Sequence, residues 1–132
     1  MLSLVVLFPS CSPQSVASPD ELRSNLNSAV SFASEAETFI DYALEGRTTR
    51  HYAEGHLDYL GEEINQLGKE LNNAHPPANA GPTVQECRRE LALLYHEVKA
   101  VRAEIRNPQA LESSKVRIAN IRATLQKAKS SL

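Results

Sequence analysis

Residues 84–105 read V-Q-E-C-R-R-E-L-A-L-L-Y-H-E-V-K-A-V-R-A-E-I, and this stretch decides the fold. Its apolar residues follow one another at alternating steps of three and four. They are Val84, Cys87, Leu91, Leu94, Val98, Val101 and Ile105. A mean step of 3.5 residues puts all seven on one stripe of an α-helix that packs lengthwise against other helices. The stretch therefore predicts a long helix with a buried seam.

Three other segments carry the same seven-membered seam. The first is Leu22, Leu26, Ala29, Ala33, Ala36, Ile40 and Ala43. The second is Ala53, Leu57, Leu60, Ile64, Leu67, Leu71 and Ala74. The last is Leu111, Ser114, Ile118, Ile121, Leu125, Ala128 and Leu132. The predicted helices cover about 19–45, 49–74, 84–106 and 108–131.

Breaks and capping residues mark the ends of these segments. Ser18-Pro19-Asp20-Glu21 and Thr83-Val84-Gln85-Glu86 have the pattern of a capping box, and Asn107-Pro108 begins the last helix. Gly46 suits the position after a helix end. The connections are short, so neighbouring helices run antiparallel. We expect an all-α, antiparallel up-down-up-down four-helix bundle over 18–132, with left-handed, heptad-type packing. A pair of hairpins that dimerises into the same bundle is the alternative, so the protein is a monomer or a homodimer.

Charge is balanced over the chain but not between the helices. Fourteen Lys and Arg against sixteen Asp and Glu give a net charge of −2, which argues against a strongly basic nucleic-acid-binding protein. The segment 18–46 has six acids and one base, net −5, whereas 108–132 has five bases and one acid, net +4. We expect these two helices to lie side by side. The basic helix carries no interleaved aromatic residues, so no nucleic-acid partner is expected.

The first 17 residues resemble a secretory leader. An apolar run over Met1–Phe8 precedes the small residues around Ser10-Cys11, and it is shorter than the roughly 20 residues that span a bilayer. Either Cys11 is lipidated, which would anchor the protein to a membrane, or the chain is cut after Ala17. We expect the bacterial cell envelope or periplasm. A cytoplasmic protein with an apolar tail is the alternative.

No pattern in the chain predicts catalysis or a cofactor. There is no Gly-rich phosphate loop, nucleophile elbow or metal-spaced Cys/His cluster, and none of the four His follows a Glu at the spacing of di-iron bundles. The seams leave little room for a group between the helices, and Cys87 belongs to one of them. We expect no enzyme activity, no cofactor and no metal.

The candidate binding site lies in the segment 39–59, which holds four of the seven aromatic residues and two of the four His. Thr48 is the expected cap of the second helix, where free N–H groups and the helix dipole favour an anion. Arginine side chains suit carboxylate or phosphate, and tyrosines suit an interface. The predicted anion- or partner-binding residues are Arg47, Thr48, Arg50, His51, Tyr52 and His56.

A simpler interpretation of the same residues stays open. Thr48 would only cap the helix, the arginines would offset nearby acids such as Asp41 and Glu45, and the tyrosines would cover the end of the bundle. For the whole chain we expect a non-catalytic protein-interaction module of the envelope with an unknown protein partner. The alternative is a bundle that binds a small ligand, an anion or a metal.

Overall fold

The structure is a computed structural model that describes residues 18–132. Within this range the protein is all-helical and has no strand. Its four helices are α1 (Pro19–Leu44), α2 (Arg50–Asn73), α3 (Gly81–Ala103) and α4 (Pro108–Ser130). The predicted leader, its cleavage after Ala17 and the lipidation of Cys11 lie outside the described residues.

Of the caps predicted for α1, α3 and α4, two are confirmed and one is wrong. The side chains of Ser18 and Asn107 accept hydrogen bonds from backbone N–H groups three residues later, each at 3.2 Å. Thr83 does not cap α3, because the helix begins two residues earlier, at Gly81, with no side-chain cap. Pro82 explains this earlier start, since its fixed φ and missing N–H suit the first turn of a helix.

Most of the buried residues are those of the predicted seams. Every seam position is buried except the last one of each helix, and those four are half-buried against the core. They are Ala43, Ala74, Ile105 and Leu132. Phe39 joins the core although it lies outside the seam of α1. One apolar core thus runs along all four helices, which is where burial stabilises the fold.

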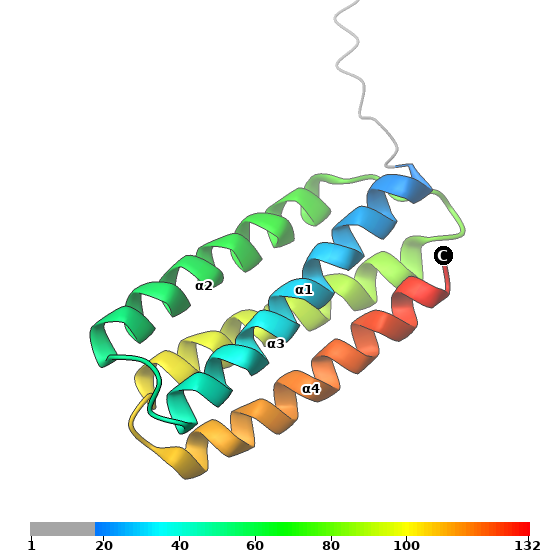
Figure 1. Cartoon of the computed structure of the whole chain (residues 1–132). Coiled ribbons are helices and arrows are strands. Elements are labelled where there is room, and N and C mark those ends of the chain that lie inside the picture. The colour runs from blue at the N-terminus through cyan, green and yellow to red at the C-terminus, as the bar shows by residue number, and fades with distance from the viewer. Residues whose placement is uncertain (1–17) are drawn as a thin grey trace, which may run out of the picture.

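The helices lie side by side around this core (Figure 1). The contacts between α1 and α4 are the most extensive, followed by those between α2 and α3, whereas α1 and α2 contact each other much less. Between α1 and α4, Arg122 pairs with Glu37 and Lys115 pairs with Asp41. The expectation that the most acidic helix lies against the most basic one is therefore confirmed.

None of the four described helices is both long enough and apolar enough to cross a membrane.

Candidate functional site

The turn between α1 and α2 begins at Gly46, whose φ of +70° places it in the left-handed region. The N–H of Arg47 then donates to the carbonyl of Tyr42 at 2.8 Å, as in a Schellman helix end. Thr49, not Thr48, caps α2, because its hydroxyl accepts from the N–H of Tyr52 at 3.2 Å. The prediction for Thr48 is wrong because two threonines stand in tandem and the extended residue directly before the helix takes the cap.

Both predicted arginines are paired with acids close by in the chain. Arg47 lies 3.1 Å from a carboxylate oxygen of Glu45, and Arg50 lies 2.8 Å from one of Glu54. Exposed pairs of this kind contribute little to the stability of the fold. Of the two acids named in the simpler interpretation, Glu45 does pair with an arginine of the turn, whereas Asp41 pairs with Lys115 on α4.

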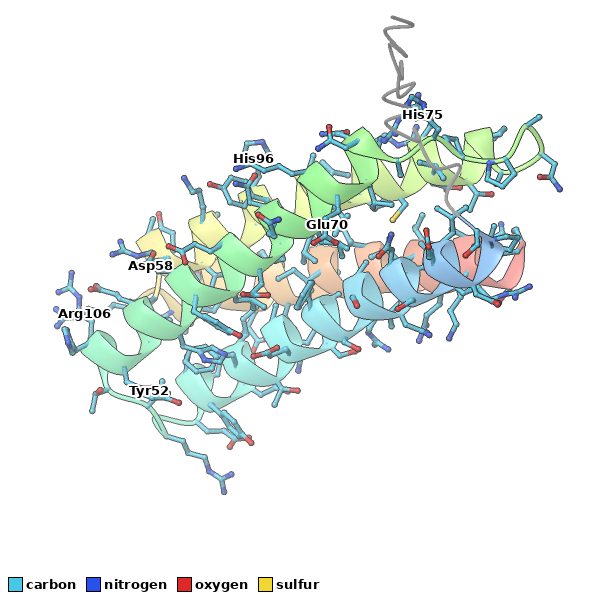
Figure 2. All side chains as sticks on the ribbon, turned by 90° about the horizontal axis from the view of Figure 1, so that it is seen from above. Tyr52, Asp58, Glu70, His75, His96 and Arg106 are labelled. Atoms are coloured by element: carbon cyan, nitrogen blue, oxygen red, sulfur yellow. The ribbon has the colours of Figure 1, made fainter. Side chains whose placement is uncertain are left out.

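A groove lies between the last turns of α1 and the first turns of α2. We call it the aromatic groove, and its volume is about 400 Å³. It is lined by Glu35, Thr38, Phe39 and Tyr42 of α1 and by Tyr52 and His56 of α2. Figure 2 shows Tyr52 at the end of the molecule where α1 passes into α2. The groove lies between two helices that contact each other much less than α1 contacts α4.

Three rings form a partly stacked platform in this groove. The imidazole of His56 stacks on Phe39, with ring centroids 4.4 Å apart and planes 21° apart. Tyr52 lies nearly parallel to His56 at 6.2 Å. The Nε2 atom of His56 also lies 3.2 Å from Oε1 of Glu35. Buried Phe39 thus supports His56, and the imidazole in turn links the rings to a carboxylate.

The aromatic groove contains only two of the predicted site residues, Tyr52 and His56. Thr48 and Arg50 instead line a separate hollow of about 290 Å³, together with Arg106 beyond the end of α3. Arg47 and His51 line neither of these two hollows. The predicted site is therefore divided between two places on the surface.

Sequence reasoning missed Glu35 and Thr38, and it did not commit to Phe39 or Tyr42. The sequence does contain a signal that Phe39 and His56 lie together. Phe39 directly precedes the seam residue Ile40, and His56 directly precedes Leu57, so both lie on the same flank of their seams. In adjacent antiparallel helices such flanks face each other.

Cys87 is a core residue. It is buried on α3, and this burial raises the pKa of its thiol to about 12. A nucleophilic cysteine needs an accessible thiolate, which this environment opposes. No group of three or more His, Cys, Asp or Glu side chains within residues 18–132 is placed to hold a metal ion.

Comparisons with protein-family models, with curated proteins and with solved structures find no match to this chain.

Proposed function

We propose that this chain is a non-catalytic protein-interaction module and that the aromatic groove is its docking surface. The observation that carries the proposal is the exposure of two tyrosines beside a hollow. Tyr42 is 44% exposed and Tyr52 is 64% exposed, although both adjoin buried Phe39. Tyrosine offers a large apolar ring and a hydroxyl at low entropic cost, and it is enriched where proteins bind each other.

The side chains that line the groove are better suited to contact with a partner than to a chemical reaction. The rings of Phe39 and His56 stack on each other, and the imidazole is held on one side by Glu35. Such a fixed platform binds without prior ordering, which lowers the cost of association. This supports binding over catalysis as the role of His56.

For the fold we propose the up-down-up-down topology with left-handed, heptad-type packing. Two contacts that each join the start of one helix to the end of another support it. Arg88 near the start of α3 donates to the carbonyl of Leu71 near the end of α2, and Arg23 near the start of α1 donates to the carbonyl of Leu132. Seams with steps of three and four would then meet along their whole length. Sedimentation distinguishes the single-chain bundle from a dimer of hairpins.

For the location we propose export to the bacterial cell envelope, with Cys11 as the lipid-bearing residue. The support is the apolar run over 2–8 that ends in Ser10-Cys11. Mass spectrometry of the full-length chain expressed in bacteria tests this proposal. A protein that retains Met1 in the soluble cytoplasmic fraction would contradict it.

A photo-crosslinking amino acid placed at position 52 tests the interaction directly. Tyr59 provides a matched control, since it is also an exposed tyrosine of α2 but does not line the aromatic groove. We expect a discrete protein adduct in the source cells from position 52 and none from position 59. Adducts of equal yield at both positions, or none at either, would contradict the proposal.

A small ligand in the aromatic groove is the second candidate, favoured by the volume of about 400 Å³, which falls in the range of ligand pockets. Thermal unfolding separates the two candidates. A bound small molecule or metal raises the unfolding midpoint by mass action. Under the interaction proposal, zinc, copper and haem leave the midpoint unchanged.

A further inference from the structure

The two helices that form the aromatic groove are unusually poor in positive charge. No Lys or Arg occurs over 24–46 or over 51–68. Eight Asp and Glu residues occupy the same two ranges, four in each. Acids left without a base beside them in these stretches would attract a cation over a distance of about 10 Å at ordinary salt.

Most acids near the groove are neutralised within the protein, but Glu35 is not. Glu37 and Asp41 pair with basic residues of α4, and Glu45 and Glu54 pair with the arginines of the turn. Within residues 18–132 the only ionic partner of Glu35 is the imidazole of His56, and 42% of the Glu35 side chain stays exposed. Glu35 therefore presents a carboxylate to the groove without a permanent cation beside it.

The acidic character continues along α2 away from the groove. Glu63 and Glu70 follow His56 at intervals of seven residues, so all three lie on one side of the helix. Figure 2 shows Glu70 on the side of α2 that faces α1. None of the ion pairs formed within residues 18–132 involves Glu63 or Glu70. The negative surface is thus long enough for several residues of a bound segment.

We propose that the aromatic groove binds a basic segment of a partner protein, with one Arg or Lys side chain laid on the rings of Tyr42 and Tyr52 and its charge beside Glu35. This inference rests on the proposed interaction function and names the chemistry of the partner. The face of an aromatic ring attracts a cation, and Arg combines this with stacking and with a hydrogen bond to a carboxylate. An acidic segment would be repelled by Glu35 and by the acids along α2.

Three synthetic peptides test the charge requirement on the full chain. The first is acetyl-Gly-Arg-Gly-Arg-Gly-Arg-Gly-amide, the second replaces each Arg by citrulline, and the third replaces each Arg by Glu. Citrulline keeps the shape of Arg and loses its charge. We expect the Arg peptide to shift the amide resonances of Tyr42, Tyr52 and His56 and the citrulline peptide to bind about tenfold more weakly. The Glu peptide leaves the spectrum unchanged.

Two variants with matched controls locate the binding. Glu35→Gln and Tyr52→Ala should each weaken binding of the Arg peptide by about fivefold or more at low salt. Glu62→Gln removes the same charge from α2 outside the groove, and Tyr59→Ala removes an exposed ring outside it, so both should bind as the parent does. All four positions are exposed or half-buried, so circular dichroism should show an unchanged fold.

The outcomes separate this inference from the interaction function itself. Equal binding of the Arg and citrulline peptides, lost in Tyr52→Ala, would overturn the cation requirement and leave the docking surface in place. A crosslink from position 52 to an acidic segment of a partner would likewise overturn the cation requirement and leave the docking surface in place. Equal weakening by Glu35→Gln and Glu62→Gln would show that overall charge, not this groove, is responsible. Absence of both crosslink and peptide binding would remove the function together with the inference.

Discussion

Glu90 is a carboxylate at the contact between α3 and α4 with only 9% of its surface exposed. Glu90 lines a separate hollow between α3 and α4. Glu97 and Arg117 line it too, and they pair with each other at 2.6 Å. Burial raises the pKa of Glu90 above its ordinary value of 4.5, and nearby Arg89 only partly opposes this rise. At neutral pH the protein therefore bears the cost of a partly desolvated charge.

This cost predicts a pH-dependent gain in stability for Glu90→Gln. The folded state favours the protonated form of Glu90. The stabilisation that this form gives is fully present at pH values below the unfolded pKa near 4.5, and it is lost as the pH rises through the higher folded pKa. We expect Glu90→Gln to raise the free energy of unfolding at about pH 7 and to lose this advantage in acid. Urea unfolding at both pH values measures it. A less stable variant at neutral pH would show that the charged form makes a favourable contact.

Cys87 carries the second prediction at this scale. With its pKa raised to about 12 by burial, the thiol should not react with a disulfide reagent at mildly alkaline pH while the protein is folded. A Cys11→Ser chain makes Cys87 the single thiol. We expect its labelling rate to follow global unfolding and to become fast in denaturant. Rapid labelling of the native chain would indicate that α3 opens locally.

Single elements owe part of their stability to capping, and the α1–α2 turn provides a matched test. Thr49 accepts the N–H of Tyr52, whereas Thr48 only donates to a neighbouring carbonyl. We expect Thr49→Ala to lower the free energy of unfolding by about 1 kcal/mol and Thr48→Ala to leave it nearly unchanged. Chemical denaturation compares the two. The reverse order would mean that α2 begins one residue earlier in solution.

In the whole molecule, the placement of α1 beside α4 depends on charge as well as on the core. Glu37 and Arg122 form a two-bonded pair between these helices, and the Glu37 side chain is only 14% exposed. We expect Glu37→Arg and Arg122→Glu each to destabilise the protein by about 1 kcal/mol and the double exchange to recover most of the loss. Thermal unfolding of all four proteins forms the cycle. Additive losses in the double variant would show that the pair is not coupled.

Most of the fold could be predicted because burial repeats at steps of three and four. Each seam residue inferred from that spacing is buried or half-buried, and the predicted helix bounds are at most three residues from those observed. The start of α3 was misplaced because a capping pattern at Thr83 competed with Pro82. The cap of α2 was misplaced because Thr48 and Thr49 have identical side chains. Local sequence does not distinguish such alternatives.

The candidate site was predictable only in part. The sequence by itself determined which stripe of each helix is buried, because the period of apolar residues is a property of one helix alone. The separation of two helices depends instead on the summed volumes of side chains from all four helices at each level of the core. Only the tertiary structure therefore decided that α1 and α2 contact each other so little, that Phe39 supports His56 beside Glu35, and that an aromatic groove remains open there.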